Sequence, residues 1–194
     1  MRIIVLGVVL GSVAAPPVTA QLPPVPVRNS LGAQVGDSGV GTATDYDALI
    51  GGWNIRFQSA SRVGKDGSPT EYGPPRAGTW TFRRTHGGRM VEDEFRLGTS
   101  ESGGTFTYRI FNPTRNLWEI QGTDVGSGRW DGGISWSDGG DRLVVQHTGS
   151  GVIRVRYYEI TADHFLWRAD ASTDGGKTWL KDVMKIEADR RREP

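Results

Sequence analysis

Four side chains in the sequence combine hydrogen-bonding or acid–base chemistry with a place in an alternating apolar pattern. Asp93 and His147 fall in step with the large apolar residues around them, and so do Tyr108 and Tyr157 in their own segments. On a strand with one buried face, this phase predicts that all four side chains point inward. A desolvated inward carboxyl has a raised pKa and can serve as an acid or base. The alternative is a bulge that turns Asp93 or His147 outward, or a hydrogen-bonded pair inside the core.

Seven tryptophans are the main excess in the composition, and alternation places most of them, Trp130 included, on the same inward face. They indicate either a packed core or the wall of an apolar cavity, since small barrels are built both ways. A few polar groups that converge in an apolar lumen are what a ligand pocket needs. The ligand-binding residues predicted on this basis are Trp80, Asp93, Tyr108, Trp118, Trp136, His147, Tyr157 and Trp167.

No familiar catalytic motif accompanies these residues. The sequence has no G-x-S-x-G elbow, H-E-x-x-H pair, P-loop, complete G-x-G-x-x-G or EF-hand loop. It has no cysteine, and its three histidines, His86, His147 and His164, lie in separate segments. We therefore assign no catalytic residue, and we expect neither a metal site nor a cofactor.

The elements that would position these side chains are strands. Large apolar residues alternate with polar ones in ten segments, at residues 53–57, 80–82, 91–97, 106–110, 118–120, 130–136, 143–145, 153–157, 165–167 and 180–186. Turn signals separate several of them, and no helical period intervenes. The pattern predicts an all-β fold, a single antiparallel up-and-down β-barrel of about ten strands, because closure removes the edges of so long a meander. A two-sheet sandwich is the alternative.

The charged residues between the apolar ones favour a solvated outer face. Arg109, Arg154, Arg156 and Arg168 fall in the outward phase of their strands. If the phase of residues 152–158 were inverted, Arg154 and Arg156 would enter the lumen and indicate an anionic ligand. The segment 63–75 is rich in glycine and proline and predicts a surface loop; the alternative is a cover over the open end of the barrel.

Composition divides the chain into three parts. Residues 1–20 predict a signal peptide, with Arg2 before an apolar run and small residues at its end, and residues 21–44 predict a flexible linker rich in proline and glycine. The folded domain is expected at residues 45–190, beginning with a short helical turn that Gly51 and Gly52 stop. We expect a secreted or periplasmic protein without a transmembrane segment.

The charges are nearly balanced. The chain has 23 Lys+Arg and 22 Asp+Glu, and the first 20 residues hold one basic residue, Arg2, and no acidic one. The remainder is formally neutral, so the sequence predicts no nucleic-acid partner and no attraction to anionic lipid. We expect a monomer.

Residues 172–179 fit the pattern S-x-D-x-G-x-T-W, which is known as the Asp-box. Asp174 can accept hydrogen bonds from backbone amides of its own turn, and Gly175 and Gly176 allow positive φ. The pattern predicts a structural hairpin turn between two strands and assigns no chemistry to it.

An ordered series of short segments resembles a bacterial calycin-like family of unknown function, over roughly residues 45 to 190. The series consists of a G-x-W motif at residues 49–53 and the segments 88–92, 108–113, 117–120, 160–167 and 172–179. The resemblance implies a lipocalin-like barrel. It implies no substrate and no catalytic residue.

Three functions remain in view at this point. The leading one is a secreted lipocalin-like barrel that binds a small apolar or amphipathic molecule in its lumen without chemistry. The second is a barrel enzyme, an isomerase, cyclase or hydrolase, that uses Asp93, His147 and a tyrosine of the lumen. The third is a structural module with a solid core.

Overall fold

The computed structural model describes residues 41–99 and 103–192 of the chain. These residues form eleven strands and two short 3-10 helices. In chain order they are η1 (Asp47–Leu49), β1 (Gly51–Val63), β2 (Pro69–Tyr72), β3 (Arg76–Thr85), η2 (His86–Gly88), β4 (Met90–Leu97), β5 (Thr105–Asn112), β6 (Leu117–Asp124), β7 (Arg129–Asp138), β8 (Asp141–Thr148), β9 (Gly151–Tyr158), β10 (His164–Ser172) and β11 (Leu180–Arg190).

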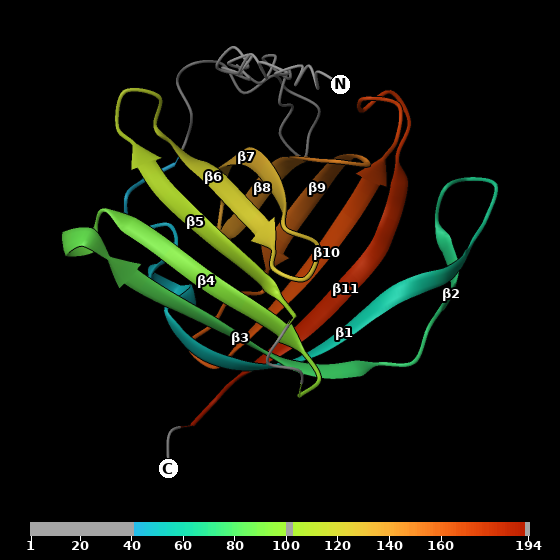
Figure 1. Cartoon of the computed structure of the whole chain (residues 1–194), viewed down its shortest axis with the longest axis horizontal. Helices are drawn as coiled ribbons and strands as arrows, with labels where there is room; N and C mark the ends of the chain where they lie inside the picture. Colours follow the sequence, from blue (N-terminus) through green and yellow to red (C-terminus); the bar gives the residue numbers. More distant parts are fainter. Residues whose placement is uncertain (1–40, 100–102, 193–194) are drawn as a thin grey trace, which may run out of the picture.

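Ten of these strands close into an antiparallel barrel (Figure 1). From β3 to β11 each strand pairs with its neighbour in sequence, and β1 pairs with β3 on one side and with β11 on the other. The closing seam runs from the pair Trp53–Arg190 to the pair Ser59–Met184. The predicted up-and-down barrel is therefore confirmed, and the seam between β1 and β11 excludes the sandwich.

Each of the ten alternating segments lies within one barrel strand, because a strand with one buried face requires an apolar residue at every second position. The interior cluster draws on all parts of the chain, with Trp53, Trp80, Trp118, Phe165 and Ile186 among its buried members. The helices found in the described ranges are too short and too polar to cross a membrane.

The segment before β1 closes one end of the barrel. The predicted helical turn is the 3-10 helix η1, and Gly51 follows it with a φ of +122°. Tyr46 and Leu49 of this segment are fully buried in the interior cluster. We call this the capped end and the opposite one the open end. The predicted signal peptide and linker residues 21–40 lie outside the described residues; residues 41–44 contact the capped end, where the Gly41 amide donates to the Asn116 carbonyl.

The predicted loop at residues 63–75 is only partly a loop. It contains β2, which pairs with the last residues of β1 and extends that hairpin beyond the barrel (Figure 1). The hairpin turn meets the start of β11, where the Lys181 amide donates to the Gly67 carbonyl at 2.7 Å. Tyr72 donates its hydroxyl to the Asp182 carbonyl at 2.7 Å. The hairpin is thus fastened to β11 and does not stand free.

Candidate functional site

The capped half of the lumen is filled with side chains. The Tyr46 hydroxyl shares a 2.7 Å hydrogen bond with Ser135 of β7, and its ring meets Trp118 edge-on at 5.1 Å. The Trp53 indole donates to the Leu49 carbonyl at 2.8 Å and its ring lies 4.7 Å from Phe165. This end is sealed by rings whose polar atoms all have partners.

Trp80 lies at the centre of the aromatic packing. Its ring centroid lies within 6.3 Å of five others, those of Phe82, Phe95, Tyr157, Phe165 and Trp167. Rings in edge-on or tilted contact at such distances leave no room for a ligand between them. In this half the tryptophans form packed core, one of the two interpretations that the sequence left open.

A buried ion pair lies beside these rings. The carboxylate of Asp93 on β4 accepts from the guanidinium of Arg109 on β5, and their side chains are 3% and 4% exposed. The other Asp93 oxygen accepts from the Trp80 indole at 2.6 Å. The guanidinium lies 4.9 Å from the Tyr46 ring centroid, and its second terminal nitrogen approaches the Tyr157 hydroxyl at 3.5 Å. Asp93 is thus an internal hydrogen-bonded partner, the alternative that the sequence had left open.

This network also acts on Tyr157. Burial raises the pKa of the Tyr157 hydroxyl, and the nearby Arg109 charge opposes that shift only in part. The Arg109 Nε is buried and has no hydrogen-bond partner among the described residues. The neutral phenol and the paired charges stabilise one arrangement of the core; nothing in their geometry supplies a free acid or base.

The open half of the lumen is built differently. Its inward positions include small residues on four strands. They are Gly78 near the start of β3, Thr107 on β5, Gly122 on β6, and Ala169 and Ala171 on β10. Its larger apolar side chains also point inward but remain partly exposed, namely Phe57, Phe95, Leu97, Ile153 and Met184. Solvent therefore reaches inward side chains at the open end of the barrel.

Polar groups face the same space. Gln146 and Thr107 flank Gly122. A Cβ atom placed on Gly122 would lie 3.3 Å from the Gln146 amide nitrogen and 3.3 Å from the Thr107 hydroxyl oxygen. Asp131 pairs with Gly122 in the sheet and shares this inward face. One Asp131 oxygen is buried and has no hydrogen-bond partner within residues 41–99 and 103–192, although the Arg129 Nε lies 3.5 Å away. These three side chains give the lumen hydrogen-bonding groups above the aromatic floor.

The predicted binding residues separate into two groups. Five point inward as predicted, namely Trp80, Asp93, Trp118, Tyr157 and Trp167. The inward placement is wrong for three others, Tyr108, Trp136 and His147, because their strands pair with the opposite phase. Whether any of them binds a ligand stays a prediction.

The predicted faces of Tyr108 and Arg109 on β5 were wrong for one reason. Its apolar residues Phe106, Tyr108 and Ile110 form the outer face, and Ile110 is 54% exposed. Arg109, predicted outward, points inward because Asp93 on the neighbouring strand compensates its charge. The pair of opposite charges was the signal in the sequence, since Asp93 was already placed inside and needed a cation.

The error on β7 and β8 comes from a second apolar cluster outside the barrel. Trp136, Leu143, Val145 and Val152 are buried together on the outer face, and Ile134 and Trp179 pack against them. His147 shares this outer phase. Trp130, also predicted inward, lies on the same side of β7 and is 59% exposed. Apolar residues on both faces make the alternation ambiguous.

The turn between β10 and β11 supplies Trp179 to this cluster. Asp174 accepts from the amides of Lys177 and Thr178 at 3.0 and 2.9 Å and from the hydroxyls of Ser172 and Thr178 at 2.8 and 2.7 Å. The hydrogen bonds from Thr178, then the one from Ser172, lower the pKa of Asp174 well below its ordinary value. The residues of the predicted Asp-box therefore hold one turn together.

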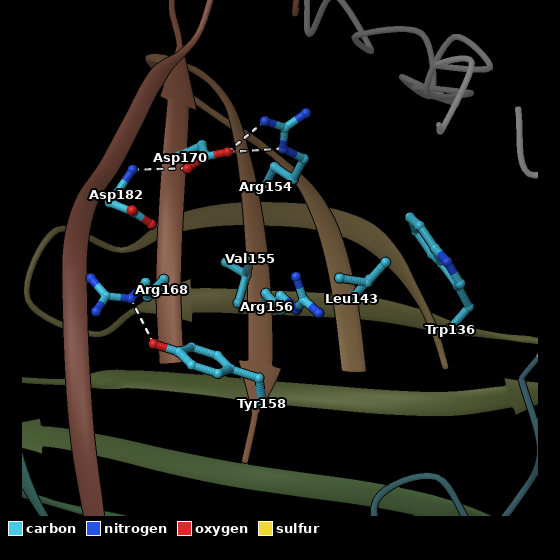
Figure 2. Close-up of a pocket in the computed structure, with 9 residues that line it drawn as sticks. All are labelled: Trp136, Leu143, Arg154, Val155, Arg156, Tyr158, Arg168, Asp170 and Asp182. Carbon is cyan, nitrogen blue, oxygen red and sulfur yellow. Dashed lines mark hydrogen bonds and ion pairs between the residues drawn. The ribbon is translucent and has the colours of Figure 1, made fainter. Parts of the chain in front are cut away.

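A pocket of about 400 Å³ lies beside the outer cluster, on the outer face of the barrel. Figure 2 shows its lining, which runs from Trp136 and Leu143 across the arginines of β9 and β10 to Asp182. Arg154 and Arg156 alternate with the inward residues Val155 and Tyr157, so their predicted outward phase is confirmed. The described residues contain no group of three or more His, Asp or Glu side chains placed to hold a metal ion.

Among solved structures, the S-type phycobiliprotein lyase CPES from Guillardia theta is similar to this chain. The TM-score is 0.53 with 9% sequence identity, over 81% of this chain and 97% of the lyase. At that identity the likeness shows a shared lipocalin-like barrel fold alone. Neither a scan against protein-family models nor a search of curated proteins gives a match.

Proposed function

We propose that the protein binds a small apolar or amphipathic molecule in the open half of the barrel lumen, without chemical conversion. The observation that carries this proposal is the partial exposure of inward apolar side chains such as Phe57 and Met184. Exposed apolar surface inside a concave site is stabilised when a ligand covers it. The similar barrel is that of an S-type phycobiliprotein lyase, and this likeness of fold supports a small-molecule ligand.

The chemistry of the walls defines the ligand. Phe57, Phe95 and Leu97 offer an apolar surface near the mouth, which suits a ring or a branched chain. Gln146 and Thr107 offer an amide and a hydroxyl deeper in the lumen, which suit a carbonyl or hydroxyl of the ligand. The polar end of the molecule would enter first, and the apolar body would remain near the mouth.

An enzymatic function has less support in the geometry. The predicted acid–base pair of Asp93 and His147 is divided by the barrel wall, with Asp93 inside and His147 on the outer phase. The Asp93 carboxylate is already engaged by Arg109 and Trp80. A solid-core module, the third candidate, would not expose the inward side chains of the open half.

The test is a titration with an apolar fluorescent probe. We expect saturable binding of one probe per chain, and we expect Ala171→Trp to abolish it by filling the mouth from β10. The matched control is Gln121→Trp, which places the same ring at an exposed outward position of β6. Absence of saturable binding, or equal binding by both variants, would reject the lumen as the site.

A second experiment would name the chemical class. Native mass spectrometry of protein purified from its own host should show a retained mass that Ala171→Trp loses. A retained mass that both variants keep would belong to another part of the molecule.

We also propose that the protein is exported and acts outside the cytoplasm as a monomer. The support is the apolar run and small-residue ending of residues 1–20. N-terminal sequencing of the exported form should begin at Gln21. A sequence that begins at Met1 in the exported form would contradict this proposal.

A further inference from the structure

The outer pocket is lined by charged side chains of both signs. It lies over β7 to β11 and is separated from the lumen by the sheet itself, because its arginines alternate with inward residues. Its volume of about 400 Å³ is within the range of small-molecule sites. It is therefore a second place where a ligand could bind, independent of the lumen.

Two of its three arginines are already neutralised. Arg154 donates to the Asp170 carboxylate, with its Nε at 3.0 Å, and its guanidinium lies 4.4 Å from the Trp179 ring centroid. Arg156 forms an ion pair with Asp141. Figure 2 shows Arg154 turned toward Asp170 at the upper edge of the pocket. These two side chains shape the wall and leave little net charge for a ligand.

Arg168 is different. Its Nε donates to the Tyr158 hydroxyl at 2.6 Å, and it has no carboxylate within 4.0 Å among the described residues. Burial lowers its pKa, but the hydrogen bond with Tyr158 and the charge of Asp182 outweigh this and raise it overall. The guanidinium stays charged, and it also interacts with the Tyr72 hydroxyl, which itself donates to the Asp182 carbonyl.

Asp182 lies near Arg168, and its charge attracts the guanidinium, but the described residues form no ion pair within 4.0 Å at its carboxylate. Its amide donates to Asp170 at 2.8 Å, but no described residue donates a hydrogen bond to its carboxylate. Asp182 has a φ of +48°, an uncommon conformation for a residue other than glycine. Figure 2 shows its carboxylate and the Arg168 guanidinium on the same side of the pocket, an anion and a cation that attract each other without a direct ion pair.

The opposite end of the pocket is apolar. Leu143 and Trp136 line it, and the Trp136 Nε1 is buried without a hydrogen-bond partner among the described residues. A ligand that fits both ends needs a paired positive and negative group at one end and an apolar body at the other.

We propose that the outer pocket binds a zwitterionic α-amino acid with a large apolar side chain. Its carboxylate accepts from Arg168, its ammonium donates to Asp182, and its side chain extends past Tyr158 toward Leu143. The charges of the ligand and the pocket then cancel in pairs, and each of these two side chains gains a direct charge-assisted hydrogen bond.

The full chain is titrated with L-phenylalanine, phenylpropionate and phenethylamine, and binding is measured by protein NMR shifts or calorimetry. Phenylalanine should bind at least about tenfold more tightly than either analogue, because each analogue lacks one of the two charged groups. Arg168→Gln should remove the preference over phenethylamine, and Asp182→Asn the preference over phenylpropionate. Asparagine also tolerates the positive φ at position 182, so this variant removes the charge and keeps the turn.

Two controls separate this pocket from other sites. Arg56→Gln removes an exposed arginine of the outer face of β1, at an ion pair with Glu187, and should leave phenylalanine binding unchanged. Ala171→Trp, which fills the mouth of the lumen, should also leave it unchanged.

Three results would overturn the proposal. They are the absence of saturable phenylalanine binding up to about 10 mM, equal affinity for phenylalanine and phenylpropionate, and binding that is lost in Ala171→Trp but kept in both pocket variants. All three results leave the lumen site standing, because that site is tested with the apolar probe, so the two proposals fail separately.

Discussion

The two halves of the barrel lumen are made by the same ten strands, yet one is packed and the other is open. In the capped half, Trp53, Trp118 and Phe165 are fully buried and the charges of Asp93 and Arg109 compensate each other. In the open half, small residues such as Ala169 lie beside partly exposed ones such as Met184. The difference supports the proposal that one end of the barrel provides stability and the other a binding site.

Removing one charge of the buried pair should have the largest effect on this comparison. Asp93→Leu leaves the Arg109 charge unpaired in the capped half and should cost about 3–5 kcal/mol of unfolding free energy in chemical denaturation. The double variant Asp93→Leu/Arg109→Met should recover much of that loss, since it removes both charges. A cost no larger than that of Glu187→Gln, at an exposed pair worth about 0–1 kcal/mol, would show that the capped half is not sealed.

Truncation of a large ring should distinguish the two halves directly. Trp118→Ala removes a fully buried ring whose indole donates to the Thr42 carbonyl at 3.0 Å, and it should cost about 3–5 kcal/mol. Phe57→Ala in the open half should cost less than about 2 kcal/mol, because its ring is already partly exposed. Its effect should appear as weaker probe binding instead. Equal losses of stability in the two variants would remove the distinction between a packed half and an open half.

The smallest effect concerns alkaline pH. Since burial raises the pKa of Tyr157 in the folded state, the folded chain keeps this proton where the unfolded chain loses it. The stability that Tyr157 contributes to the folded state is therefore fully present below about pH 10 and is lost as the pH rises further. The unfolding equilibrium constant then increases by up to about tenfold per pH unit. Tyr157→Phe has no such proton, so its denaturation midpoint should fall less steeply between pH 9 and 11. If the denaturation midpoints of the two proteins fell equally steeply with pH, Tyr157 would have to be in contact with water in the folded state.

The sequence predicts the strands well and the faces of some strands poorly. Every apolar segment became a barrel strand, because alternation over several residues depends on backbone geometry alone. The face that a strand turns inward depends on its neighbours. Arg109 enters the core only because Asp93, on the neighbouring strand β4, compensates its charge. Trp136 leaves the core because Leu143 and Val145 build a second cluster outside.

The candidate sites show the same limit. Trp80, Asp93 and Trp167 were placed inside from their phase alone, but their packing into a solid floor depends on contacts among β3, β4 and β10. The outer pocket had no signal in the one-dimensional pattern, since Arg168 and Asp182 come together only through the pairing of β10 with β11. The strand β2 was missed because it is only four residues long and lies between turn-forming residues such as Gly67 and Gly73.

The methionine methyl groups test the central claim most directly. Met184 lies in the open half of the lumen, and Met90 lies on the outer phase of β4, where it pairs with the exposed Ile110. In protein with ¹³C-labelled methionine methyl groups, addition of the apolar probe should shift the Met184 signal with saturation at one probe per chain and leave the Met90 signal in place. Saturable probe binding that leaves Met184 unchanged would contradict the account, because the ligand would then lie outside the open half of the lumen.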